Sequence, residues 1–210
     1  MRKCPSALTV ETVETFILHL LKRFSNFQAT DEQAVLKDLQ EALRRADARI
    51  GEEAAHHPEF AGMGTTLTMA LVSGRTLFVI HAGDSRGYLF RAGRRRQLTF
   101  DHTVAAELAR RGVIKPEEVR RHQWRHIVTN ILGGGAAGVQ VDVQKAALEP
   151  GDVLLLCTDG LTEMLPDDRI AAVLAAQHEP ESACRHLVDK ANEQGGRDNV
   201  TAIVICVEAI

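Results

Sequence analysis

Hydrophobic positions recur at helical spacing near the start of the chain. They predict one helix over residues 7–24 and a second over residues 31–51. The second segment separates an apolar face from a face of alternating charges, as amphipathic surface helices do. Asp31 is placed to cap its start, and Gly51 is placed to end it. The first part of the chain is therefore predicted to be helical.

The pattern changes at residue 65 to short apolar runs separated by glycine-containing turns. These runs predict strands at 65–72, 76–81, 87–91, 94–98, 139–143, 153–157 and 200–207. Helical patterns between them predict helices at 101–111, 116–124, 166–176 and 181–192, the first of them capped by Asp101. Short turns between strands indicate mainly antiparallel sheet, and the long helices come before and after it. This order predicts a layered α+β domain with helices packed on sheets.

Composition and charge are those of an ordinary globular protein. The 210 residues fit one domain, 1–210, with 45% hydrophobic and 25% charged residues. A net charge of −3 gives no general attraction to nucleic acid or to a membrane surface. No apolar stretch has the length of a membrane span, and the first residues lack the continuous apolar run of a signal peptide. Four scattered cysteines without zinc-ligand spacing favour a reducing, cytoplasmic location.

One stretch places a carboxylate at the end of a buried strand. The apolar run Leu154–Cys157 stops at Thr158-Asp159-Gly160, where the glycine allows a sharp turn or a close approach. Asp159 is therefore expected at the exposed end of a core strand, in a suitable place for a metal ligand. A cap on the helix that follows is the other interpretation, and this stretch alone leaves both open.

Asp84 and Asp198 have the same kind of surroundings as Asp159. Each lies beside an apolar strand and next to a glycine or within a glycine-containing turn. Three carboxylates gathered at one end of a sheet would repel each other, and a hard divalent cation such as Mg²⁺ or Mn²⁺ would relieve that repulsion. Three unrelated turn residues are the alternative, since aspartate is common in turns.

Five short motifs occur in order along the chain. They are Gly62-Met63-Gly64-Thr65-Thr66, the stretch HAGDSRGY at 81–88, LTFDHT at 98–103, the segment from Gly151-Asp152 through CTDGLT at 157–162, and GRDNVT at 196–201. Together they resemble the metal-dependent protein serine/threonine phosphatases of the PP2C type, bacterial branch. The resemblance covers nearly everything from about residue 60 to the end of the sequence.

The resemblance implies a fold, a reaction and a site. The family fold is a sandwich of two mainly antiparallel β-sheets flanked by helices. The implied reaction is removal of phosphate from phosphoserine and phosphothreonine in proteins, with two Mn²⁺ or Mg²⁺ ions sharing a bridging water. Asp159 and Asp198 resemble the carboxylates of the first metal, and Asp84 resembles a residue of an additional metal. The implied partners are phosphorylated proteins and a Ser/Thr kinase.

The family also has an N-terminal block that the sequence does not show. That block carries a phosphate-binding arginine, an Asn-Glu-Asp-type motif and an Asp-Gly-x-Gly-Gly-type motif, whereas residues 1–6 lead directly into the first predicted helix. No catalytic residue is therefore assigned, and an N-terminally incomplete sandwich with impaired or lost activity is expected. The alternative function is a non-catalytic regulatory module that binds a phosphoprotein or a Ser/Thr kinase.

Overall fold

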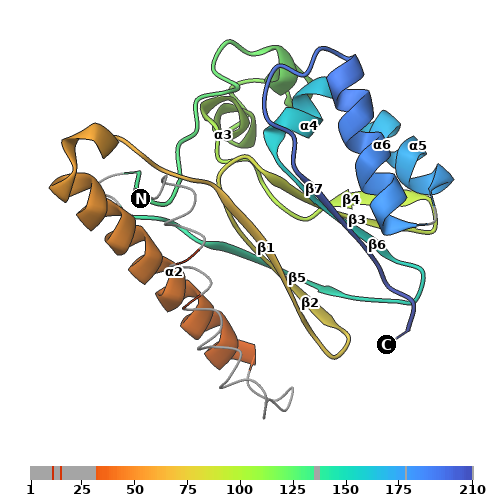
Figure 1. Ribbon diagram of the computed structural model, residues 1–210, viewed down its shortest axis with the longest axis horizontal. Coiled ribbons are helices and arrows are strands. Elements are labelled where there is room, and N and C mark those ends of the chain that lie inside the picture. The colour runs from red at the N-terminus through yellow and green to blue at the C-terminus, as the bar shows by residue number, and fades with distance from the viewer. Residues whose placement is uncertain (1–10, 12–14, 16–31, 135–137, 178, 210) are drawn as a thin grey trace. The chain divides into compact units, whose positions relative to one another are not determined.

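The computed structural model describes residues 11, 15, 32–134, 138–177 and 179–209 (Figure 1). Apart from Glu11 and Thr15, the helix predicted over residues 7–24 lies outside the described residues, and so does the cap at Asp31. The chain divides into two compact units, of which the first comprises Met1–Leu67, His81–Gly83 and His102–Val143, and the second comprises Thr68–Ile80, Asp84–Asp101 and Gln144–Ile210. The assignment of residues 1–210 to a single domain stays a prediction.

A four-stranded sheet of order β4-β3-β6-β7 is the central element of the second unit. Its strands are β3 (Arg86–Arg91), β4 (Arg94–Gln97), β6 (Val153–Cys157) and β7 (Ala202–Cys206). All three strand pairs are antiparallel. In this register, Leu155 of β6 pairs with Tyr88 of β3 on one side and with Val204 of β7 on the other. The strand β6 is central, which agrees with its continuous apolar run.

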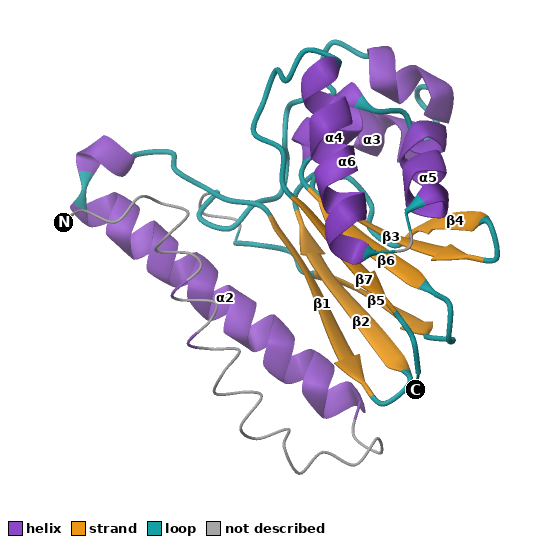
Figure 2. Cartoon of the chain, turned by 45° about the vertical axis from the view of Figure 1, so that its right-hand side comes forward, coloured by secondary structure: helices purple, strands orange, loops and turns teal. Residues whose placement is uncertain are grey.

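A second sheet has the order β1-β2-β5 and packs on the first within the second unit. Its strands are β1 (Leu67–Ser73), β2 (Thr76–Ala82) and β5 (Asp142–Ala147), and most of their residues belong to this unit. Side chains of both sheets form one buried cluster: Leu77, Val79, Leu89, Leu98, Ala146, Leu148, Leu154 and Leu156. Figure 2 shows the strands of both sheets as orange arrows. The predicted α+β sandwich is confirmed.

Three helices of the second unit cover the outer face of the four-stranded sheet (Figure 1). They are α4 (Asp159–Met164), α5 (Asp167–Ala176) and α6 (Pro180–Glu193). Their apolar residues, among them Leu161, Ile170 and Leu187, form a second buried cluster with Tyr88 and Leu155. Alternate residues of β6 therefore face the two cores, which fixes the register of the strand.

The first unit contains α2 (Glu32–His56), α3 (Val104–Arg110) and the 3₁₀ helices η1 (Pro58–Phe60) and η2 (Pro116–Arg121). The prediction that the second helix ends at Gly51 is wrong, because α2 continues to His56. Good helix-forming residues follow Gly51, and Arg49 bonds Glu53 across one turn at 2.7 Å, which stabilises the extension. The helix stops shortly before Pro58, which cannot continue it.

A predicted cap and the bounds of several elements also differ from those expected. The cap of α3 is Thr103, whose hydroxyl accepts a hydrogen bond from the Ala106 amide, so the prediction of Asp101 as the cap is wrong. The helix predicted over 116–124 is the shorter η2, and the strand predicted at 139–143 begins at Asp142 instead. No helix in the described part of the chain has the length and apolar character needed to cross a membrane.

Candidate metal centre

Asp159 lies where β6 ends and α4 begins. Its carboxylate accepts a hydrogen bond from the Gly160 amide at 3.0 Å, and no side chain caps the helix from Thr158. The Thr158 side chain instead bonds the segment before β7, accepting from the Thr201 amide at 3.0 Å. Asp159 therefore lies just beyond the end of β6, as the first residue of α4.

The Asp198 turn lies directly against the start of α4. A Cβ atom on Gly160 would overlap the carbonyl oxygen of Asn199 and lie 3.0 Å from its carbonyl carbon. Only glycine allows this approach of the two backbones. Asp198 itself is exposed, and its carboxylate accepts from the Asn199 amide at 2.7 Å. Two of the three predicted carboxylates are thus brought to neighbouring positions.

Asp84 follows Gly83 at the end of β2 and is half-buried. Burial, followed by the negative charges of Asp159 and Asp101, raises the pKa of Asp84 to about 6. Burial and the charge of Asp198 likewise raise the pKa of Asp159. Asp159 thus affects the pKa of Asp84, and Asp198 affects the pKa of Asp159, through their negative charges.

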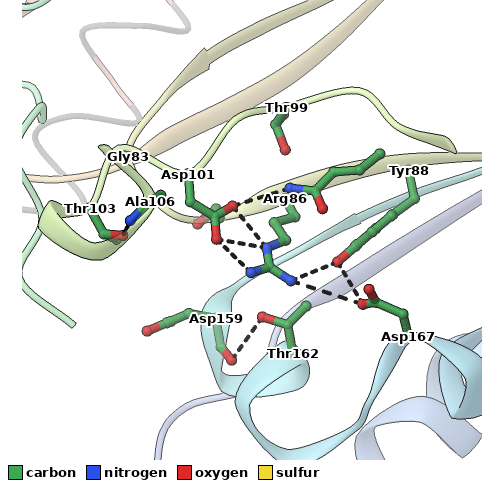
Figure 3. Close-up of polar contacts among 12 residues, drawn as sticks. Gly83, Arg86, Tyr88, Thr99, Asp101, Thr103, Ala106, Asp159, Thr162 and Asp167 are labelled. Carbon is green, nitrogen blue, oxygen red and sulfur yellow. Dashed lines mark hydrogen bonds and ion pairs between the residues drawn. The ribbon is translucent and has the colours of Figure 1, made fainter. Parts of the chain in front are cut away.

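Figure 3 shows a partly buried hydrogen-bond network around Arg86, drawn together with Asp159. Arg86 Nη1 donates to the Tyr88 hydroxyl at 3.0 Å, and that hydroxyl donates to Asp167 at 3.2 Å. Arg86 also makes a bidentate pair with Asp101, whose hydrogen bonds and charge raise the pKa of Arg86 against the opposing effect of burial. Arg86 and Asp101 were not predicted as functional residues, although both lie inside quoted motifs.

Cys157, two residues before Asp159, is an unsuitable nucleophile. Its side chain is buried at the end of β6, and burial raises the pKa of the thiol to about 12. The reactive form of cysteine is the thiolate, which is scarce at neutral pH for such a group. Chemistry at this end of the sheet therefore depends on oxygen groups.

Comparison with known proteins defines the family. The model of the protein phosphatase 2C family matches residues 7–112, and that of stage II sporulation protein E matches residues 115–208. The serine/threonine protein phosphatase PstP of Mycobacterium tuberculosis is 38% identical over 170 residues, which are 81% of this chain and 32% of PstP. The serine/threonine phosphatase stp of Listeria innocua is 34% identical over 80% of this chain and 66% of its own length.

A solved structure agrees with these matches. The crystal structure of the catalytic domain of the serine threonine protein phosphatase PstP in complex with two manganese ions is 33% identical, with a TM-score of 0.76. The match covers 95% of this chain and 82% of that one. The chain belongs to the protein phosphatase 2C family, as its motifs predict. It spans about one third and just under two thirds of the lengths of the two curated relatives.

The described residues fit a hard cation only in part. Asp84 and Asp159 are crowded, partly desolvated carboxylates, and oxygen donors of this kind suit Mg²⁺ or Mn²⁺. No group of three or more His, Cys, Asp or Glu residues within the described ranges is arranged to hold a metal ion. The donor set therefore fits a hydrated cation bound through one or two carboxylates, and it does not form a complete cage of protein ligands.

Proposed function

We propose that this chain is the phosphatase domain of a metal-dependent protein serine/threonine phosphatase. Its substrates would be phosphoserine and phosphothreonine residues of proteins, including those made by a Ser/Thr kinase. The observation that carries the proposal is the gathering of Asp84, Asp159 and Asp198 at neighbouring turns, where the pKa values of Asp84 and Asp159 are raised. Membership of the protein phosphatase 2C family supports it.

Asp159 and Asp198 would hold one Mn²⁺ or Mg²⁺ ion, and Asp84 would contribute to a further one. Such an ion supplies an activated water and positive charge for attack on a phosphate ester. The protein's own part is to hold these carboxylates in place. Three features hold them there: the position of Asp159 at the start of α4, the Gly160–Asn199 contact and the Gly83–Asp84 turn.

A cytoplasmic location is part of the proposal. Cys157, Cys184 and Cys206 are free thiols in the structure, and disulfides are rare in reducing compartments. Fractionation of cells that express the tagged full-length protein, with a known cytoplasmic marker alongside, tests this point. Recovery with the membrane or secreted fraction would contradict it.

The experiment is hydrolysis of a phosphothreonine peptide with Mn²⁺ or with a chelator, using the wild type, Asp159→Asn and Asp189→Asn. Asp189 is an exposed residue of α6 and makes a matched control of the same chemical change. The proposal predicts Mn²⁺-dependent turnover that is lost in Asp159→Asn and kept in Asp189→Asn. Turnover that is equal in both variants would exclude the proposed site.

A non-catalytic regulatory module is the second candidate function. The lack of a three-ligand group among the described residues favours it. Such a module would bind the phosphothreonine peptide without releasing phosphate. Calorimetry with the intact peptide, followed by measurement of free phosphate in the same sample, distinguishes the module from the enzyme.

A further inference from the structure

Gly83, the residue bonded to Asp84 by a peptide link, is fixed by three hydrogen bonds. Its amide donates to His102 Nδ1 at 3.0 Å. Its carbonyl accepts from the His102 amide at 2.7 Å and from His81 Nε2 at 3.0 Å. The amide and the carbonyl of this one residue are therefore both hydrogen-bonded to histidines, and His102 bonds each of them.

The Thr66 side chain occupies the space that a Cβ atom of residue 83 would need. The residue has a φ of +118°, and a Cβ atom there would lie 2.5 Å from Thr66 Cβ. Gly83 therefore cannot move toward Thr66, and its positive φ is one that other residues rarely adopt. His102 on one side and Thr66 on the other restrict the backbone that leads into Asp84.

His102 is itself held in one orientation. Because the backbone N–H of Gly83 can only donate, His102 Nδ1 is an acceptor. It also accepts a hydrogen bond from the side-chain nitrogen of Asn130 at 2.9 Å. In the neutral ring the hydrogen then lies on Nε2, which is 3.0 Å from the Asp142 carboxylate and donates to it. The ring also stacks on His81 with centroids 5.0 Å apart.

Asn130 is fixed in turn by the backbone of Gln140. Its side-chain nitrogen donates to the Gln140 carbonyl at 2.7 Å, and its oxygen accepts from the Gln140 amide at 2.9 Å. These two bonds set the direction of the Asn130 amide, so that its nitrogen faces His102. A connected set of hydrogen bonds thus runs from Gln140 and Asp142 through His102 to Gly83.

We propose that His102 is a positioning residue for Asp84, and this rests on the proposed function of the acidic turns. The imidazole accepts the hydrogen bond of the Gly83 amide, and so it restricts the backbone that carries Asp84 and the directions in which the Asp84 carboxylate can point. Residues that orient a ligand from behind commonly change metal affinity by one to two orders of magnitude when they are lost.

The test compares His102→Ala, His102→Asn and Asp142→Asn with the wild type. Asparagine places an oxygen acceptor close to the position of Nδ1, so His102→Asn keeps the bond from Gly83 while it loses the bond to Asp142. His186→Ala is the control, because His186 is exposed on α6 and its ring bonds Ser182 of the same helix. The two readouts are hydrogen exchange of the Gly83 amide by NMR and Mn²⁺ affinity by electron paramagnetic resonance.

In His102→Ala, hydrogen exchange of the Gly83 amide is expected to be about tenfold faster, which corresponds to the loss of one hydrogen bond. Mn²⁺ affinity is expected to fall by about tenfold or more. His102→Asn is expected to stay near the wild type in Gly83 exchange and to recover most of the affinity. Asp142→Asn is expected to lie between them, and His186→Ala to match the wild type.

Two results would overturn the inference. One is a folded His102→Ala variant with wild-type Gly83 exchange and wild-type Mn²⁺ affinity. The other concerns His102→Asn. The inference fails if this variant keeps slow exchange of the Gly83 amide but loses as much Mn²⁺ affinity as His102→Ala does. If His102→Ala does not fold, His102→Asn and Asp142→Asn still decide the question. A wild type that binds no Mn²⁺ contradicts the proposed function, and Gly83 exchange then still tests the role of His102 in holding the turn.

Discussion

The Arg86 guanidinium forms a bidentate ion pair with the Asp101 carboxylate. Nε lies 2.8 Å from Oδ1 and 3.0 Å from Oδ2, and Nη2 lies 2.5 Å from Oδ2. The two side chains are only 17% and 13% exposed, so neither charge is well solvated. Removing one partner of such a desolvated pair is costly, because the charge that remains has lost its partner.

Asp101→Asn is expected to lower the free energy of unfolding by about 3 kcal/mol, because it leaves the partly buried Arg86 charge with only the Asp167 carboxylate, 3.9 Å away, as an anionic partner. Urea denaturation followed by circular dichroism measures the change. The control is Glu181→Gln, which removes a carboxylate from an ion pair whose side chains are 74% and 80% exposed. That control is expected to leave the midpoint unchanged, because exposed pairs contribute little. Equal effects of the two substitutions would contradict the role given to Arg86.

Gly160→Ala tests the close approach of the Asp159 and Asp198 turns. The added methyl group would overlap the Asn199 carbonyl, which is backbone and cannot rotate away. A loss of about 2 kcal/mol in the free energy of unfolding is expected from this overpacking. Weaker Mn²⁺ binding is expected with it, because the two carboxylates are forced apart.

Gly51→Ala is the matched control for that substitution. Gly51 lies inside α2 with no atom near the position of a Cβ. The same change is therefore expected to raise the free energy of unfolding by about 0.5 kcal/mol, through the better helix propensity of alanine. The two substitutions are therefore expected to change the free energy of unfolding in opposite directions, and one denaturation series measures both. A neutral Gly160→Ala would show that the turns have room to separate.

Without a bound cation, Asp84 is expected to destabilise the folded chain as the pH rises. Its pKa is raised from 3.8 to about 6, so the folded state holds the proton more strongly than the unfolded state does. Stability from this group is therefore present at acid pH and lost as the pH rises from about 4 through about 6. In chelator, Asp84→Asn should gain stability over the wild type across that range. A pH-independent difference in unfolding free energy would contradict this.

Asp152 is expected to show the opposite pH dependence. Burial would raise its pKa, but the Arg91 hydrogen bonds, the Glu149 amide and the Arg91 charge together lower it. The carboxylate bonds Arg91 Nε and Nη2 at 2.7 Å each, and its stabilising effect is lost as the pH falls through the lowered pKa. Asp152→Asn should therefore be less stable than the wild type at pH 7 and should approach it in strong acid. Denaturation midpoints at both pH values check this.

Local patterns were sufficient to predict the strands and the acidic turns. Apolar runs of strand length are hard to place anywhere but in a core, and glycine next to aspartate marks where such a strand ends. The residues 154–157, followed by Asp159 and Gly160, therefore led to the correct strand end. The five motifs added the family and the sandwich, which no single run of residues determines.

Contacts between distant residues decided the features that the pattern could not predict. Asp101 has the appearance of a helix cap, yet its carboxylate bonds Arg86, fifteen positions earlier, and Thr103 caps the helix. Gly51 has the appearance of a helix end, yet the ion pair from Arg49 to Glu53 spans it. The hydrogen bonds of His102 to Gly83, Asn130 and Asp142 likewise join segments that are far apart in the sequence.

The proposed metal site is tested most directly by crystals grown with Mn²⁺ and measured for anomalous scattering at the manganese absorption edge. The account predicts a peak within coordination distance of Asp159 and Asp198, and no such peak in crystals of Asp159→Asn. Crystals of Asp189→Asn should keep it. Wild-type crystals with no anomalous peak at these carboxylates, or with a peak only elsewhere on the chain, would contradict the account.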